Sequence, residues 1–345
     1  MRYTNNCTRM IRCRSSHLSR PVSVIALAAL GLSVADAARP AEAPCRGNAD
    51  TAHEHCESLS FGGRERTYRL YVPSQLAARV PLLLVLHPAL FDGVSMEAIT
   101  ARSFDQHGNQ AGALIVYPDG IDQHWNDGRE GIATTAAREH IDDVGFLRTL
   151  VAVLSARYPV DTERVFVTGF SNGGMMTLRL ACEATDVFRG FVAVAASLSE
   201  ELAARCQPQV ARRVALIDGT ADGLVPYGGG GVGALGITRG RVVGAEATFD
   251  AFRKLAGCSG AGSEPLPGKT PRDRTDVIVH RATGCPADRP VVLFEIKGGG
   301  HAWPGGARVP PQVFLLRGKL SGDIDATEEA WRFLGLGEIP AVRTE

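Results

Sequence analysis

The sequence predicts an α/β fold, in which a mostly parallel, doubly wound sheet is covered by helices on both faces. Short apolar runs typical of buried strands recur along the chain and alternate with segments of helical periodicity. The 345 residues and 45% apolar composition are enough for one large core. The formal charge is zero, so neither nucleic acid nor an anionic membrane surface is indicated as a partner.

The first 37 residues are expected to be a secretory signal peptide. Five arginines lead into the apolar run 22–34, which is too short to span a bilayer comfortably. Ala35-Asp36-Ala37 then fits a small-x-small cleavage site, and an uncleaved anchor is the alternative. Cleavage would give a secreted protein, extracellular or periplasmic, without a stable membrane anchor.

The mature chain is expected to begin with an irregular segment, which three strand patterns follow. Residues 38–60 have no clear period and are expected to be an N-terminal segment ahead of a catalytic domain over residues 61–345. Residues 67–72 end at a proline and are typical of a partly exposed strand. The continuous apolar run 81–87 is typical of a central parallel strand, and residues 113–117 form a third strand closed by Pro-Asp-Gly.

Helices and strands then alternate. Asp142-Asp143 caps a helix in which Val144, Leu147, Val151 and Leu154 fall on one face. The other predicted strands are 165–168, 190–195, 214–217, 277–282 and 291–296, and the other predicted helices are 175–182, 242–252 and 326–334. Strands separated by helices favour parallel neighbours with helices on both faces of the sheet.

A G-x-S-x-G pattern, Gly169-Phe170-Ser171-Asn172-Gly173, lies between a predicted strand and a predicted helix. A serine on such a turn has a strained backbone, and only small neighbours let the turn close. The turn exposes the Ser171 hydroxyl above the sheet, and the following helix points N–H groups at the same place. Ser171 is therefore the candidate nucleophile, with an incidental serine in a glycine-rich turn as the alternative.

A serine nucleophile needs a base and an acid, which in α/β-hydrolases follow in the order Ser, Asp or Glu, His. The candidate base is His301, in a glycine-rich loop after the predicted strand 291–296. Two aspartates that follow the strand 214–217 compete for the acid. Asp218 ends that strand, whereas Asp222 lies farther into the loop and can reach a histidine. Asp222 is preferred, with an Asx-turn role as its alternative.

Two backbone N–H groups are expected to stabilise the oxyanion. One belongs to Asn172, directly after the nucleophile, and the other to Ala89, because Pro88 in the same loop has no N–H. Candidates for lining the substrate pocket, with plain packing as the alternative, are Trp125, Asn126 and Trp303.

The cysteine count agrees with export. Six cysteines remain after the signal peptide, and an even number in an oxidising compartment indicates disulfides, although six allow fifteen pairings. Sequence proximity favours Cys45–Cys56, Cys182–Cys206 and Cys258–Cys285. No C-x-x-C spacing supports a metal site.

Gly228–Gly233 satisfies G-x-G-x-x-G literally. No predicted strand precedes it and no helix opens directly after it, so a dinucleotide site is not supported. We expect a mobile surface loop instead.

Eight segments carry a further pattern: Leu86-His87, 116–120, Trp125-Asn126, 142–146, 169–176, 180–183, 222–226 and 299–305. Together they resemble the secreted feruloyl esterase and polyhydroxybutyrate depolymerase family of α/β-hydrolases, over roughly residues 65–335. The resemblance implies Ser171 as nucleophile, Asp222 as acid and His301 as base. It also favours the disulfides Cys182–Cys206 and Cys258–Cys285.

The chain departs from that family at two places. Members usually carry His-Gly after the third strand, and here His87-Pro88 stands there, so an altered oxyanion loop is expected. The strand before the acid often ends in His-Gly, and here it ends in Asp218-Gly219. A second carboxyl group is therefore expected close to the catalytic residues, where it competes with Asp222 for the imidazole.

The sequence thus predicts a secreted serine esterase that works through an acyl-enzyme, with no metal or cofactor. The resemblance implies feruloyl or acetyl esters on polysaccharides, or hydroxyalkanoate polyesters of the polyhydroxybutyrate type. The substrate would be a small molecule, an oligosaccharide or a polyester, and the sequence does not choose among them. A serine peptidase of the same fold and a catalytically silent binding protein are the alternatives.

Overall fold

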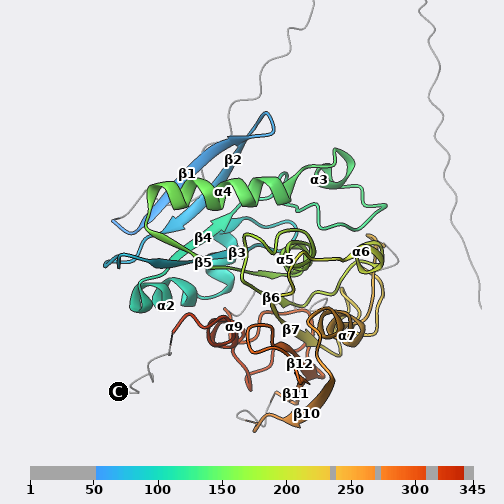
Figure 1. Cartoon of the computed structure of the whole chain (residues 1–345). Coiled ribbons are helices and arrows are strands. Elements are labelled where there is room, and N and C mark those ends of the chain that lie inside the picture. Colours follow the sequence, from blue (N-terminus) through green and yellow to red (C-terminus); the bar gives the residue numbers. More distant parts are fainter. Residues whose placement is uncertain (1–51, 234–237, 269–272, 308–317, 338–345) are drawn as a thin grey trace, which may run out of the picture. The chain divides into compact units, whose positions relative to one another are not determined.

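A ten-stranded sheet is the frame of the fold in the computed structural model, which describes residues 52–233, 238–268, 273–307 and 318–337 (Figure 1). In sheet order the strands are β1 (Glu54–Phe61), β2 (Arg64–Tyr71), β4 (Leu114–Pro118), β3 (Val80–Leu86), β5 (Val160–Phe170), β6 (Gly190–Val194), β7 (Arg213–Gly219), β12 (Val291–Lys297), β11 (Asp276–Thr283) and β10 (Gly260–Pro265). The pairs from β4 to β12 are parallel, and the outer pairs are antiparallel. The mostly parallel α/β sheet that the sequence predicts is confirmed.

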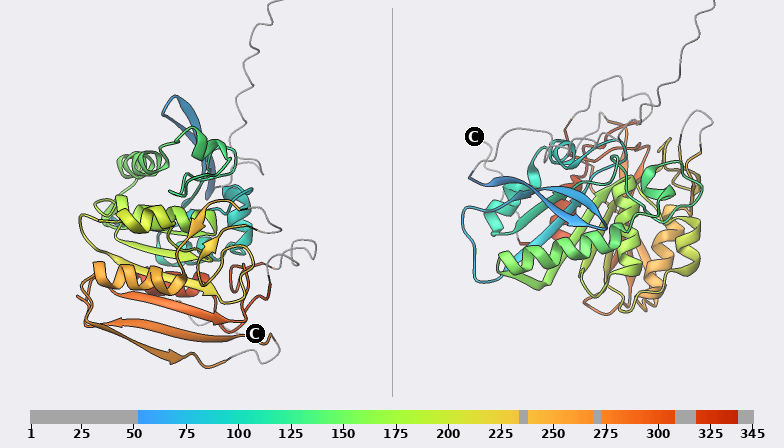
Figure 2. Two further views of the ribbon diagram at one scale, coloured as in Figure 1. Left: turned by 90° about the vertical axis from the view of Figure 1, so that its right-hand side faces the viewer. Right: turned by 90° about the horizontal axis from the view of Figure 1, so that it is seen from above.

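Helices cover both faces of this sheet. They are α1 (Gly93–Ile99), α2 (Ser103–Ala111), α3 (Thr135–Arg138), α4 (Asp143–Arg157), α5 (Asn172–Glu183), α6 (Glu200–Arg205), α7 (Ala245–Leu255) and α9 (Ala326–Leu334). Helices α4, α5 and α7 lie on one face of the sheet and α1, α2 and α9 on the other (Figures 1 and 2). The buried side chains of the first three helices join one core, and those of the other three join a second core. The strands supply both cores because their side chains alternate: in β3, Leu82 and Leu84 face the first core and Leu83 and Val85 the second.

The structure contains elements that the sequence does not predict, namely α1, α2, α3, α6 and β10, and the first sheet edge also differs. Residues 54–60, expected in an N-terminal segment, form most of β1, which pairs antiparallel with β2. The sheet therefore begins before residue 61. The proposed signal peptide, residues 1–37, lies outside the described residues and stays a prediction.

Three interior segments also differ from their predicted bounds. Gly228–Gly233, expected as a loop, contributes the two-residue strand β8 (Gly230–Gly231), which pairs with β9 (Arg241–Val242). Because Val242 belongs to β9, α7 begins only at Ala245. Helix α5 begins at Asn172 rather than Met175, so it follows the candidate nucleophile without any spacer.

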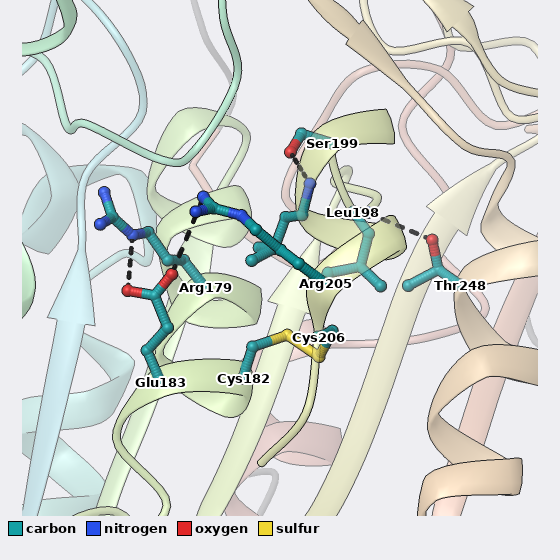
Figure 3. The surroundings of a disulfide bond; sticks show 9 residues. Arg179, Cys182, Glu183, Leu198, Ser199, Arg205, Cys206 and Thr248 are labelled. Carbon is teal, nitrogen blue, oxygen red and sulfur yellow. Dashed lines mark hydrogen bonds and ion pairs between the residues drawn. A yellow bond between two sulfur atoms is a disulfide. The ribbon is translucent and has the colours of Figure 1, made fainter.

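Two disulfides form within the described part of the chain. Cys182 at the end of α5 bonds to Cys206, the residue after α6, close to Arg179, Glu183 and Arg205 (Figure 3). The second disulfide is Cys258–Cys285. Both predicted pairings are confirmed, whereas Cys45 lies outside the described residues, so its pairing with Cys56 stays a prediction.

None of the helices in the described ranges is both long enough and apolar enough to span a bilayer.

Candidate active site

Ser171 lies on the turn between the carboxyl end of β5 and the start of α5. Its main chain has φ 55° and ψ −119°, a conformation that costs roughly 1–3 kcal/mol. Glycines allow this turn to close: a Cβ at Gly169 would lie 2.4 Å from the Gly173 oxygen, and one at Gly173 would lie 2.4 Å from the Leu86 oxygen. Ser171 itself is partly exposed, so a substrate can reach it.

Asp222 and His301 meet at the same edge of the sheet, because β5, β7 and β12 run parallel and their carboxyl ends point the same way. His301 Nδ1 donates to Asp222 Oδ2 at 2.7 Å, and both side chains are buried. A carboxylate only accepts, so the Nδ1 atom carries the proton and Nε2 is left as the acceptor.

The same carboxylate also shapes its own loop. Asp222 Oδ1 accepts the N–H groups of Leu224 and Val225, each at 2.8 Å. The two roles that the sequence offers for Asp222, an Asx-type turn and a partner for the histidine, are therefore filled by its two oxygens at once. The turn fixes the direction in which the second oxygen points.

The loop that carries His301 packs tightly against the loop that carries Asp222. Ala221 N–H donates to the Gly299 oxygen at 2.8 Å, and a Cβ at Gly219 would lie only 2.4 Å from that oxygen. Glycines are therefore required where these backbones touch. The His301 ring stacks on Phe170, the residue before Ser171, with ring centroids 5.1 Å apart and planes inclined by 27°.

The two predicted oxyanion donors belong to segments that pack together. Asn172 is the first residue of α5, so its N–H has no carbonyl one turn earlier in the helix. A Cβ at Gly173 would lie 2.5 Å from the His87 oxygen, which places the chain after β3 against this first turn. The N–H of Ala89, two residues on, is bonded to no backbone carbonyl within the described part of the chain.

His87 is held as a neutral structural residue at the end of β3. Its Nδ1 bonds to the Pro88 oxygen at 2.8 Å, and its Nε2 accepts the Gly120 N–H at 2.9 Å. Burial is the main cause that lowers the pKa of His87 to about 4, so the ring is uncharged at neutral pH. Both ring nitrogens are occupied, which leaves none for the chemistry at Ser171.

The three candidate pocket residues all make internal contacts. Trp125 is buried, and its Nε1 donates to the His87 oxygen at 3.0 Å. Trp303 is buried against Phe104 and Phe170, with its Nε1 donating to Thr327 Oγ1 at 3.0 Å. Asn126 Nδ2 donates to the Ile141 oxygen at 2.9 Å. Their contact with a substrate stays a prediction.

Asp218 lies at the end of β7 on the same sheet edge as Asp222. One oxygen, Oδ1, accepts the Ala196 N–H at 2.8 Å, and the other, Oδ2, is buried without a hydrogen-bond partner among the described residues. Burial is the main cause that raises the pKa of Asp218 well above its usual range, and the charge of Asp222 raises it further. The raised pKa favours the protonated form of Asp218, and that form adds no second negative charge to the site.

Sequence reasoning missed a buried ion pair beside the nucleophile turn. Asp127 and Arg129 are both buried, and the Asp127 carboxylate also accepts from the Asn172 side chain at 2.6 Å. Two oppositely charged residues two positions apart in a loop look like surface residues. Only their place directly after Trp125-Asn126 could have drawn attention to them.

Proteins of similar sequence include named esterases. The chain is 32% identical over 256 residues to NocK of Nocardia uniformis subsp. tsuyamanensis, a protein assigned as an esterase. This alignment covers 71% of this chain and 72% of that protein. It is 28% identical over 231 residues to feruloyl esterase B of Piromyces equi, covering 64% of this chain and 39% of that enzyme. Residues 137–202 match the prolyl oligopeptidase family.

A solved acetyl xylan esterase from Aspergillus awamori has the same fold. Its TM-score is 0.50 and its sequence identity 14%, with 79% of this chain and 94% of that chain covered. At this identity the likeness supports the architecture and leaves the substrate open.

Proposed function

Because the chain belongs to the feruloyl esterase-like α/β-hydrolases and is a carboxylic-ester hydrolase, we propose that it cleaves esters through an acyl-enzyme on Ser171. The observation that carries this proposal is the 2.7 Å bond between Asp222 Oδ2 and His301 Nδ1, at the sheet edge where the strained Ser171 turn also lies. The order Ser171, Asp222, His301 along the chain is that of α/β-hydrolases.

The proposed reaction starts with attack of Ser171 Oγ on the ester carbonyl, while its proton passes to His301 Nε2. Asp222 holds the imidazole in the tautomer that keeps Nε2 free and stabilises the imidazolium that forms. His301 then returns the proton to the departing alcohol. Water, activated by the same histidine, attacks the acyl-enzyme and releases the acid.

The proposed oxyanion donors are the N–H groups of Asn172 and Ala89. Both belong to backbone that is held by packing before substrate arrives, so little reorganisation is needed as charge develops. Losing one such donor typically lowers kcat by about 10²–10³-fold.

For the substrate we propose an ester on a plant polysaccharide or one of its oligosaccharides, with a phenolic acid such as ferulic acid as the first choice. The feruloyl esterase among the relatives supports this choice. Acetyl and hydroxyalkanoate esters remain the alternatives. Export to the periplasm or the medium, after removal of residues 1–37, is part of the proposal and is supported by the two disulfides.

The test is hydrolysis of 4-nitrophenyl acetate by the mature protein beside Ser171→Ala and Asp222→Asn. We expect Ser171→Ala to be inactive and Asp222→Asn to lose activity by about 10⁴-fold, because the wrong histidine tautomer is then favoured. Active wild type can next be compared on methyl ferulate, acetylated xylooligosaccharides and hydroxybutyrate oligomers. Unchanged activity in Ser171→Ala would refute the proposal.

A second candidate, a serine peptidase, is favoured by the match of residues 137–202 to the prolyl oligopeptidase family. A proline-containing peptide nitroanilide tests it with the same proteins. Hydrolysis of the anilide with a kcat/KM above that of every ester would support the peptidase. Failure of a serine-directed fluorophosphonate to label the wild type would instead support a catalytically silent protein.

A further inference from the structure

The side chain of Asn172 is fixed at both ends by the loop 125–127. Its Oδ1 accepts the Trp125 N–H at 2.9 Å, and its Nδ2 donates to the Trp125 oxygen at 3.1 Å. The same Nδ2 donates to Asp127 Oδ2 at 2.6 Å. Main-chain N–H groups only donate and carbonyls only accept, so these partners also fix the orientation of the amide.

Asp127 is in turn held by a buried arginine. Arg129 Nε lies 3.1 Å from both carboxylate oxygens, and its terminal nitrogen donates to Asp127 Oδ2 at 2.7 Å. The Arg129 backbone N–H also donates to Asp127 Oδ1 at 3.1 Å. The side chains of Asp127 and Arg129 are 0% and 7% exposed. A paired, fork-like contact of this kind is rigid as well as strong.

Arg129 continues the connection to a distant segment. Its second terminal nitrogen donates to the Arg239 oxygen at 2.7 Å. The next residue, Gly240, has φ 75°, and a Cβ there would lie 2.9 Å from the Arg129 Cβ. Val232 in turn donates to the Gly240 oxygen at 3.0 Å. One chain of polar contacts therefore runs from the first residue of α5 to the strand pair β8–β9.

We propose that Asp127 and Arg129 are positioning residues, which set the place of the Asn172 N–H through the Asn172 side chain. The proposal rests on the function proposed above, in which that N–H stabilises the oxyanion. Asn172 directly follows the strained Ser171, and a first-turn residue without such ties is free to fray. Both side chains are buried, and in this proposal they act through Asn172.

A purely structural ion pair and a positioning pair predict different kinetics. An interaction that serves only the transition state lowers kcat and leaves KM unchanged when it is lost. A misplacement of about 1 Å in such a site can cost about 10²-fold in rate. A structural pair would change only the fraction of folded protein, so kcat per folded molecule and the affinity for a transition-state analogue would stay those of the wild type.

The experiment is a double-mutant cycle on the active enzyme with Asn172→Ala and Asp127→Ala. Asn172→Ala keeps the backbone N–H and removes only its side-chain ties. We expect each single variant to lower kcat about 10- to 100-fold with KM within about threefold. The double variant should be no worse than the poorer single variant, because both changes break the same connection.

The matched control is Leu334→Ala, a core change near the amino end of β6, where a Cβ at Gly190 would lie 2.8 Å from the Leu334 Cδ2. Ser171 lies at the other end of the parallel strands, the carboxyl end. The control should lower the melting temperature, and its small effect on kcat/KM should simply add to that of Asn172→Ala. Arg129→Lys is the milder variant if Asp127→Ala does not fold. It keeps the charge and loses the fork, so a kcat between those of wild type and Asn172→Ala is expected.

The affinity for phenylboronic acid is a measurement that does not depend on the stability of the protein. The adduct on a serine is tetrahedral and anionic, so its affinity should fall in parallel with kcat/KM in Asp127→Ala and Asn172→Ala. Additive losses in the cycle, or unchanged kcat and boronate affinity in folded Asp127→Ala, would overturn the proposal. Failure of the proposed function itself would show separately, as an active Ser171→Ala.

Discussion

The backbone at Ser171 is a strained conformation that its neighbours impose. The strain persists because the first turn of α5 fits closely against the end of β3, and the amide of Ser171 donates to the Val194 oxygen at 2.9 Å. The position of the hydroxyl is therefore a product of backbone packing more than of any side-chain contact.

We expect Gly173→Ala to lose both stability and activity. The new Cβ would lie 2.4 Å from the Leu86 oxygen and 2.5 Å from the His87 oxygen, and neither backbone atom can move without opening the turn. The free energy of unfolding should fall by about 2 kcal/mol or more, measured by urea titration. Gly262→Ala is the control, since a Cβ there meets nothing within 4 Å, and a wild-type-like Gly173→Ala would contradict the argument.

We expect Asp218→Asn to become more stable than the wild type as the pH rises. Because burial raises the pKa of Asp218, the folded state holds its proton to a higher pH than the unfolded state, which releases it near the ordinary carboxyl pKa. The wild type therefore loses stability between that range and the raised pKa, and the asparagine does not. Asparagine also keeps an acceptor for the Ala196 N–H.

The measurement is urea unfolding of both proteins from pH 4 to pH 9. A difference in the free energy of unfolding that stays constant over this range would mean that Asp218 is ionised in the folded protein.

At the residue scale, the sequence pointed to Ser171, Asp222 and His301 because each follows a strand with a recognisable pattern. The structure brings Asp222 and His301 into contact, although their roles in catalysis remain proposed. The sequence could not point to Asp127 and Arg129. Their buried environment is made by Asn172 and Arg239, which are distant in sequence, and no periodicity marks such a contact.

At the scale of elements, four segments meet around a cluster of charges that, apart from Arg102, are buried. Arg69 of β2 bonds to Glu97 of α1 at 2.8 Å, and Arg102, before α2, lies 3.1 Å from the same carboxylate. Asp105 of α2 accepts the Tyr117 hydroxyl of β4 at 2.9 Å. Burial first, and then the hydrogen bond and charge of Asp105, raise the pKa of Glu97 to about 8. A proton is therefore held between the two carboxyl groups at neutral pH.

We expect the packing of α1 and α2 to weaken as this proton is lost. The folded state binds a proton that the unfolded state has already released above the ordinary glutamate pKa, so stability falls as the pH rises toward and through about 8. Glu97→Gln cannot ionise and should lose this part of the pH dependence. Hydrogen exchange of α1 and α2 amides at pH 6 and pH 9 checks it, and equal pH dependence in both proteins would contradict the assignment.

The composition and burial of the individual elements explain which of them the sequence could predict. The central strands are continuous apolar runs that are buried on both faces, as in β3 and β6, so composition alone indicates them. At the sheet edges, β1 is mostly polar and partly exposed, whereas β10 is rich in small residues and mostly exposed. The pairing of both strands depends on the neighbouring strand. α2 has few apolar residues, and its buried side chains are Phe104, which joins the second core, and Asp105.

At the scale of the whole molecule, the order of strands decides where the site lies. The nucleophile, acid and base are separated by 51 and 79 residues along the chain, the differences between positions 171, 222 and 301. They meet because β5, β7 and β12 are parallel and close in the sheet order. That order cannot be derived from the apolar runs themselves, and only the chain order of the three residues indicates it.

The two disulfides should stabilise the molecule without shaping its chemistry. Cys182–Cys206 and Cys258–Cys285 close loops of similar length, with sequence separations of 24 and 27. Replacing either pair with serines should therefore lower the free energy of unfolding by about 3 kcal/mol, because the unfolded chain regains the entropy of the loop.

Urea unfolding measures the change in stability, and nitrophenyl ester kinetics measure the change in activity. Cys182 lies in the last turn of α5, and the other end of this helix carries the candidate site, so the pair beside β10 and β11 is the matched control. Equal stability losses with unchanged kcat at 25 °C are expected, since the turn at Ser171 is held by backbone packing on β3. A fall of kcat confined to the Cys182–Cys206 variant would instead mean that the far end of α5 helps to hold the nucleophile.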